Sequence, residues 1–161
     1  MKPPPAPLPT LHATALIVGD AGVLIRGRSG AGKSRLAEGL VEAAQARGLF
    51  GRMVADDRVS AVRCNGRIVL SPHPAIAGLV ERRGQGIVPV AHEGSVVLRL
   101  VVDLAERGPA GEGPSRYPEP ADLATVIDGV AVPRLALLIG DEAGPSLVLR
   151  RLEVDGAQKR G

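Results

Sequence analysis

One stretch of the sequence has the residue types and the spacing of a phosphate-binding loop. GRSGAGKS, at positions 27–34, fits the pattern G-x-x-x-x-G-K-S and follows the apolar run AGVLI after a single arginine. In such loops the backbone amides cradle phosphate, the lysine reaches the β- and γ-phosphates, and the serine hydroxyl ligates Mg²⁺. The expected nucleotide-binding residues are Gly27, Arg28, Ser29, Gly30, Ala31, Gly32, Lys33 and Ser34.

The lysine of this stretch is unusual for the chain. Lysine occurs only at Lys2, Lys33 and Lys159, and every other basic residue apart from histidine is arginine. A compact ammonium group fits a tight ring of backbone amides around a phosphate better than a planar guanidinium does. The retained lysine therefore favours a working loop over a chance match.

Two adjacent acids, Asp56 and Asp57, follow at the end of an expected strand. Phosphoryl transfer to a hydroxyl needs a group that accepts the proton, and usually a carboxylate near the metal. Adjacent strand residues point to opposite faces, so we expect the two acids to differ in role. A pair of turn caps on the surface is the alternative. No N-K-x-D guanine motif is present, which leaves ATP as the expected nucleotide by elimination.

The elements that must position these residues form one α/β domain with a mixed sheet. The segments ATALIV and VLIRG indicate a hairpin that leads into the loop, and residues 34–46 have helical spacing. The segment 72–90 is punctuated by Pro and Gly, with a short helical turn expected near 75–80, and 106–120 is expected to be a mobile surface loop. Two further hairpins are expected: SAVRC and RIVL around an Asn-Gly turn, and ATVI and VAV around an Asp-Gly turn. The remaining expected strands are RMVADDRV, residues 95–104, RLALLI and SLVLRRLEV.

Composition limits the class of protein. The 161 residues are 45% hydrophobic and 23% charged, which suits one folded domain. No apolar run approaches the roughly 20 residues that cross a membrane, the start lacks a secretory signal, and Cys64 is the only cysteine, so we expect a cytoplasmic protein with no membrane partner. The net charge is +3, but the arginines are scattered and only Phe50 and Tyr117 are aromatic, so we expect no nucleic-acid partner.

Three motifs in order resemble the catalytic domain of HPr kinase/phosphorylase. They are H-x₁₄-GRSGAGKS, VADDRV and ERRGQGI, and the resemblance covers roughly residues 11–105. The third motif matches the family signature E-I-R-G-L-G-I at Glu81, Arg83, Gly84, Gly86 and Ile87, with Arg82 and Gln85 in place of aliphatic residues.

This resemblance implies a fold, a reaction and a set of roles. The fold is a single P-loop kinase domain with a mixed, β-rich sheet over residues 11–154, between a Pro-rich tail (1–10) and a C-terminal tail (155–161). The reaction is ATP- and Mg²⁺-dependent phosphorylation of a serine of HPr, the small phosphocarrier of the sugar phosphotransferase system, and its reversal. Asp56 would be the base, His12 would assist the catalytic pair, Arg83 would orient phosphate beside Lys33, and Mg²⁺ would lie among Ser34, Asp57 and Glu81.

The resemblance also has departures. Only the kinase core is expected, without the family's N-terminal domain or its helical C-terminal tail, and Arg116 is the best match for a later basic loop. The family's assembly implies a homo-oligomer.

Two alternatives remain open: a P-loop kinase for a small metabolite, with 106–120 as its lid, and a nucleotide-sensing module without catalysis, which Asp56 disfavours. Asp103 could mimic a magnesium-binding acid, but we expect a strand-end cap.

Overall fold

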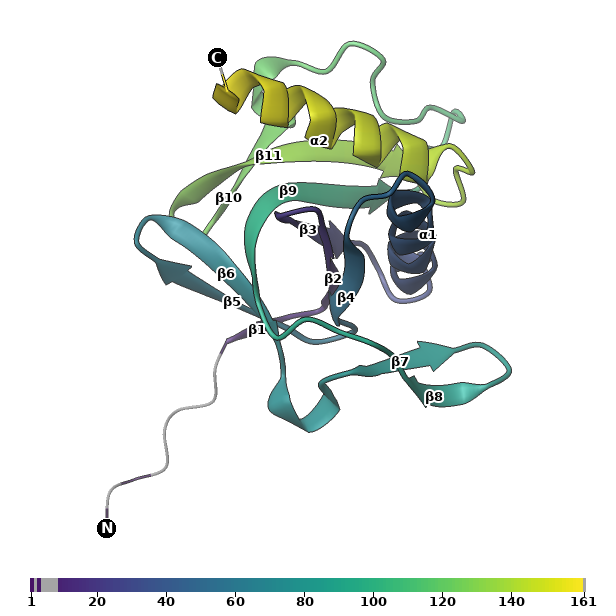
Figure 1. Ribbon diagram of the computed structural model, residues 1–161. Helices are drawn as coiled ribbons and strands as arrows, with labels where there is room; N and C mark the ends of the chain where they lie inside the picture. The colour runs from purple at the N-terminus through teal and green to yellow at the C-terminus, as the bar shows by residue number, and fades with distance from the viewer. Residues whose placement is uncertain (2, 4–8, 161) are drawn as a thin grey trace.

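The computed structural model describes residue 1, residue 3 and residues 9–160 (Figure 1). Most of the predicted Pro-rich tail, and Gly161 of the predicted C-terminal tail, lie outside the described residues. The elements in chain order are β1 (Thr10–Leu11), β2 (Ala13–Val18), β3 (Ala21–Arg26), α1 (Lys33–Ala46), β4 (Gly51–Ala55), β5 (Val59–Cys64), β6 (Arg67–Pro72), η1 (Pro74–Ile76), β7 (Leu79–Arg82), β8 (Gly86–Pro89), β9 (Val96–Ala105), η2 (Pro120–Leu123), β10 (Ala124–Ile127), β11 (Val130–Leu138) and α2 (Gly144–Arg160).

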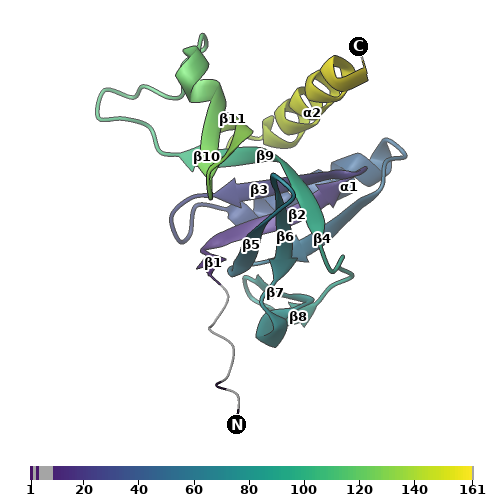
Figure 2. The same ribbon diagram turned by 90° about the vertical axis from the view of Figure 1, so that its left-hand side faces the viewer.

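Nine of the strands form one mixed, curled sheet. The order runs β1-β5-β6-β9-β3-β2-β4, and β11 also pairs with β9 and carries β10 at its other edge. Strand β9 runs parallel to both β3 and β11. On the other side of β3, strand β2 pairs antiparallel with β3 and with β4. The first residues of β9 pair with β6 and its last residues pair with β11, so the sheet divides along this strand (Figure 2).

Two apolar cores lie on the two faces of the sheet. The helices α1 and α2 cover one face and pack against each other, with Ala37, Leu40, Val148 and Leu149 buried there. The other face of β2, β3 and β9 packs against the curled strands β5 and β6, where Leu24, Ile68, Leu70 and Val101 are buried. Neither helix of the described chain is long and apolar enough to span a bilayer.

Several expected elements are confirmed. The hairpin β2–β3, the helix α1 and the two Gly-containing turns are present, and both residues of each turn, Asn65-Gly66 and Asp128-Gly129, have positive φ. Such φ values are typical of the tight turns that Asn-Gly and Asp-Gly favour. The segment 106–119 contains no helix or strand, as its Gly and Pro content predicted.

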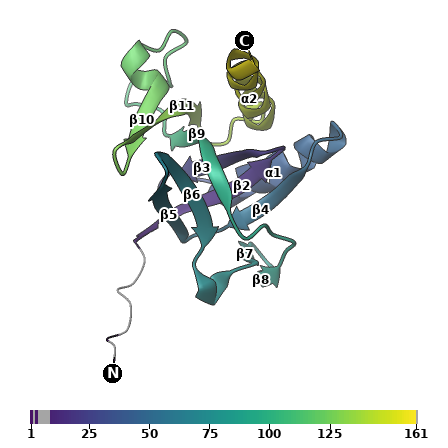
Figure 3. The same ribbon diagram turned by 60° about the vertical axis from the view of Figure 1, so that its left-hand side comes forward.

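The structure corrects the sequence analysis in the C-terminal segment and adds an element to the segment 72–90. The expected strand SLVLRRLEV is wrong, because this segment is part of helix α2, so the described part of the chain has two long helices, and the expectation that a helical C-terminal segment is missing is also wrong. Pro145 suits the first turn of this helix, and Val148, Leu149 and Leu152 share its buried face at helical spacing. Helix α2 also continues through residues 155–160, which the predicted domain boundary assigned to a tail. The segment 72–90 holds the separate hairpin β7–β8 in addition to the short turn η1 (Figure 3).

Asp103 joins three strands through an ion-pair network and is not a simple cap. Its carboxylate accepts hydrogen bonds from Arg26 Nε and Nη2 at 2.7 and 2.8 Å and from Arg134 Nε at 2.5 Å. Burial raises the pKa of Asp103, but the two guanidinium groups outweigh burial and leave that pKa below its usual range. Because Arg26 directly precedes the phosphate-binding loop, this network fixes the end of β3 against β9 and β11.

The network predicts a pH dependence of stability. A carboxyl group whose pKa is lower in the folded state stabilises the fold above its unfolded-state pKa of about 4, and this contribution is lost as the pH falls through the folded-state value. We expect Asp103→Asn to lower the free energy of unfolding by about 1–3 kcal/mol at pH 7, because it removes the charged partner of two arginines. In urea unfolding, the difference in the free energy of unfolding between Asp103→Asn and wild type should become smaller below about pH 4. Asp20→Asn, in the exposed β2–β3 turn, is the control, and an Asp103→Asn profile parallel to wild type would contradict the prediction.

Candidate active site

The loop between β3 and α1 has the geometry of an anion cradle. Gly32 forms the N-cap of α1 with φ 91°, a left-handed conformation in which side chains are strained. A Cβ atom on Gly27 would lie 3.2 Å from Leu104 Cβ, so the loop packs closely on β9. Arg28, Ser29 and Gly30 are exposed at the tip. Loop amides and the N-terminus of a helix such as the 14-residue α1 are the groups that attract phosphate in proteins, and phosphate binding by this loop stays a prediction.

Lys33 lies inside the loop that it is expected to serve. Its side chain is buried, and Nζ donates to the backbone carbonyls of Gly27 at 2.9 Å and Arg28 at 3.0 Å. The ammonium group therefore lies against the first two residues of the loop, where it could contact the phosphates of a bound nucleotide.

Asp56 contacts the serine of the loop. Ser34 Oγ donates to Asp56 Oδ1 at 2.7 Å, and Thr14 Oγ1 donates to the same oxygen at 2.8 Å. Asp56 is 7% exposed and follows directly after strand β4. Sequence analysis did not identify Thr14. The signal that could have found it is a threonine inside the apolar run ATALIV, two residues after His12.

Asp57 points elsewhere because the chain turns after β4. Its φ of 65° is left-handed, and its carboxylate Oδ1 lies 3.5 Å from His12 Nδ1. Both side chains are more than half exposed. The structure thus separates the two adjacent acids, with Asp56 on the loop serine and Asp57 beside His12 at the surface. Their different roles stay a prediction.

The oxygen atoms around Ser34 are suited to Mg²⁺. This ion prefers hard oxygen ligands and is commonly held by one or two protein groups together with substrate phosphates. A hydroxyl group has one proton and two lone pairs, so Ser34 can donate to Asp56 and still offer a lone pair to a metal. Among the described residues there is no group of three or more His, Cys, Asp or Glu side chains that could hold a metal by themselves.

The hairpin β7–β8 carries the third motif. Glu81 is exposed on β7, opposite Ile87 of β8, and Arg83 is exposed in the turn between the strands. Arg82 Nη2 lies 3.0 Å from Glu38 Oε2, so an ion pair ties the hairpin to helix α1 one turn beyond Ser34. The metal-binding role of Glu81 and the phosphate-orienting role of Arg83 stay predictions.

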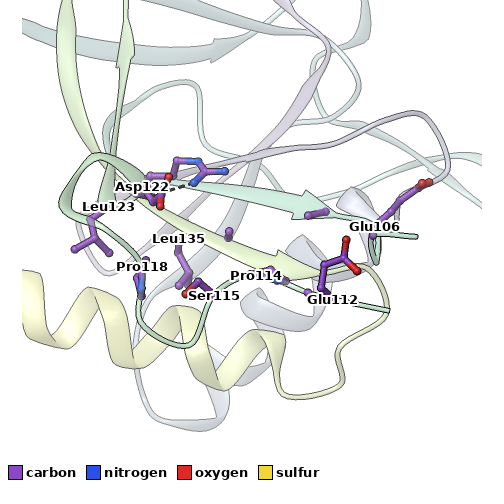
Figure 4. A pocket seen from close by; sticks show the side chains of 13 residues that line it. Glu106, Glu112, Pro114, Ser115, Pro118, Asp122, Leu123 and Leu135 are labelled. Atoms are coloured by element: carbon purple, nitrogen blue, oxygen red, sulfur yellow. Dashed lines mark hydrogen bonds between the residues drawn. The ribbon is translucent and has the colours of Figure 1, made fainter. Parts of the chain in front are cut away.

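The segment after β9 forms a pocket beside the loop. A cavity of about 450 Å³ lies between residues 105–118 and strand β11, with Glu106 at one end and Asp122 at the other (Figure 4). Arg134 also lines this cavity, and its Nη1 donates to the backbone carbonyl of Asp122. Glu106 also makes an ion pair with Arg28 of the phosphate-binding loop. Arg116 is exposed on this segment, and its match to the family's basic loop stays a prediction.

A sequence model of the HPr Serine kinase C-terminal domain matches residues 6–139, which include the loop, both acids, His12 and the hairpin β7–β8. The chain belongs to this family. The resemblance stated from the three motifs is therefore confirmed.

Relatives in the HPr Serine kinase family support the assignment. The chain is 33% identical over 148 residues to an HPr kinase/phosphorylase of Azoarcus sp., covering 87% of this chain and 44% of the relative. It is 36% identical over 85 residues to an HPr kinase/phosphorylase of Clostridium tetani, covering 53% of this chain and 26% of the relative. The chain spans less than half the length of either relative.

A solved structure shares the fold. The Hpr(Ser) kinase/phosphatase from Coxiella burnetii superposes with a TM-score of 0.72 at 24% identity, covering 95% of this chain and 99% of that chain. The predicted fold class, an α/β domain with a mixed, β-rich sheet like that of the HPr kinase catalytic domain, is confirmed.

Proposed function

We propose that this protein is an ATP- and Mg²⁺-dependent serine kinase that phosphorylates HPr and so regulates the sugar phosphotransferase system. The observation that carries the proposal is the contact of Ser34 with Asp56 next to the buried ammonium of Lys33, with Asp57 and His12 exposed nearby. The same proposal includes that the protein is cytoplasmic, that it forms a homo-oligomer, and that it also catalyses the reverse reaction on seryl-phosphorylated HPr.

The loop and Asp56 support binding of Mg·ATP. Lys33 Nζ can exchange its bonds to the loop carbonyls for the β- and γ-phosphates, and Ser34 with Asp56 would hold Mg²⁺. Mg²⁺ held by these residues would neutralise the charge that develops on the phosphates. Asp56 is mostly buried and already accepts two hydrogen bonds on one oxygen, so it suits a fixed role beside the metal.

Asp57 is better placed than Asp56 to serve as the base. An acceptor serine on another protein arrives from solvent, and Asp57 is the exposed carboxylate, with His12 3.5 Å away. In this scheme the serine proton passes to Asp57, the serine oxygen bonds to the γ-phosphorus, and the bond from that phosphorus to ADP breaks. The family resemblance gave the base role to Asp56 and the metal role to Asp57. The geometry favours the exchanged assignment.

Incubation with HPr tests the substrate. Purified protein, γ-labelled ATP, Mg²⁺ and purified HPr should give an acid-stable label that peptide mapping places on serine and not on histidine. A panel of sugars and nucleosides under the same conditions should remain unlabelled. Labelling of a small molecule without labelling of HPr would identify a metabolite kinase, and ATP binding without any transfer would identify a sensing module.

A further inference from the structure

Thr14 is a buried polar residue that the proposed reaction does not yet use. It lies in β2 between Ala13 and Ala15, all three with no exposed surface. Its hydroxyl donates to Asp56 Oδ1 at 2.8 Å across a sequence separation of 42 residues. A buried hydroxyl without a partner costs free energy, so this hydrogen bond explains how a threonine is tolerated in an otherwise apolar strand interior.

The strand register places Thr14 at this carboxylate. Ala15 of β2 pairs with Ala55 of β4 in antiparallel register, and β4 ends at that residue. One step further along the same register puts Thr14 opposite Asp56, the first residue past the strand. The chain turns there, since Asp57 has φ 65°. Asp56 is therefore held by a neighbouring strand where its own strand no longer constrains it.

The two hydrogen bonds to Asp56 Oδ1 come from two different elements. Ser34 belongs to the first turn of α1 and is the residue expected to meet the metal, whereas Thr14 belongs to the rigid sheet. Thr14 thus connects the sheet to the carboxylate that orients Ser34. Residues that lock the rotamer of a metal-site carboxylate affect metal affinity strongly, commonly by ten- to a hundredfold.

We propose that Thr14 is a positioning residue, which holds the Asp56 carboxylate against Ser34 and thereby sets the affinity of the site for the metal–nucleotide complex. The inference rests on the proposed function, because it requires Mg²⁺ and ATP to bind at the loop. Thr14 has no exposed surface and its hydroxyl contacts Asp56, so it acts only through Asp56.

Two substitutions separate the hydroxyl from the volume of Thr14. Thr14→Val keeps the shape and removes the hydrogen bond, whereas Thr14→Ser keeps a hydroxyl and removes a methyl group. Binding is measured by electron paramagnetic resonance of Mn²⁺ with the β,γ-methylene analogue of ATP, which needs no phosphoryl transfer. We expect Thr14→Val to weaken Mn²⁺ binding by about tenfold to a hundredfold, as for loss of one hydrogen bond to a charged group, and Thr14→Ser to stay within about threefold of wild type.

Thr14→Ala and thermal unfolding serve as controls on folding. Alanine lacks the hydroxyl and leaves space, so it must weaken Mn²⁺ binding like valine if the hydroxyl is responsible, and it replaces the valine variant if that variant does not fold. Binding unchanged in both hydroxyl-free variants would overturn this inference alone, as would a serine variant as weak as valine. Failure of the wild type to bind Mn²⁺ with the analogue would overturn the proposed function and this inference together.

Discussion

Lys33→Ala should abolish phosphoryl transfer and weaken ATP binding while leaving the domain folded. Lys33 Nζ is the buried cation at the mouth of the loop, held 2.9–3.0 Å from two loop carbonyls. Its removal takes away the charge that meets the β- and γ-phosphates, both in the ground state and as charge develops during transfer. We expect transfer to fall by at least about a thousandfold, with ATP affinity reduced by about ten- to a hundredfold. Isothermal titration with ATP and labelling of HPr measure the two effects.

Two further variants make the Lys33 result specific. Lys33→Arg keeps the positive charge but brings a planar fork into a position that accommodates a point charge, so it should restore little transfer. Arg47→Ala removes an exposed cation at the far end of α1 and should match wild type. Full activity in Lys33→Ala would mean that the loop does not bind the transferred phosphate.

The parts of the fold that the sequence predicted correctly are those with local signals. The loop glycines, the Asn-Gly and Asp-Gly turns and the 3.6-residue spacing of α1 each depend on a few adjacent residues. Helix α2 was misread because Val148 and Val154 favour strands in isolation. The helix is stabilised by packing of Val148 and Leu149 against α1 and the sheet, and by the Arg151–Asp155 ion pair at i,i+4 spacing. Tertiary contacts of this kind override propensity.

The candidate site was predictable as a set of residues but not as a set of contacts. The loop residues, the two acids and the histidine could be named from motifs. The contact of Thr14 with Asp56 depends on the pairing register of β2 with β4, which no local pattern reveals. Strand alternation led us to expect that the two acids differ, but both lie past the end of β4, and their separation depends on the left-handed turn at Asp57. An aspartate is among the few residues that adopt this conformation readily, and the sequence alone does not show that it does so here.

Asp57→Asn should remove catalysis while Asp56→Asn should weaken the metal site. Asparagine tolerates the left-handed φ of 65° at position 57, so the first substitution removes the proton acceptor without disturbing the turn. With Asp57→Asn we expect kcat for HPr phosphorylation to fall by about two to four orders of magnitude, the usual contribution of general base catalysis, at unchanged Mg·ATP affinity. With Asp56→Asn we expect a raised Mg²⁺ requirement and partial recovery of transfer at high Mg²⁺, because a neutral amide still accepts hydrogen bonds from Ser34 and Thr14.

The measurement is a Mg²⁺ titration of initial rates for both variants, with Asp20→Asn as the control for the same chemical change in an exposed turn far from the loop. The two substitutions remove the same charge from neighbouring residues, so a difference between their Mg²⁺ profiles reports position and not net charge. If Asp56→Asn were inactive at every Mg²⁺ concentration while Asp57→Asn merely required more Mg²⁺, the base would be Asp56, as the family resemblance implies. Asp56 would then have to accept the serine proton on Oδ2, because its Oδ1 already accepts both hydrogen bonds, and the residue is only 7% exposed.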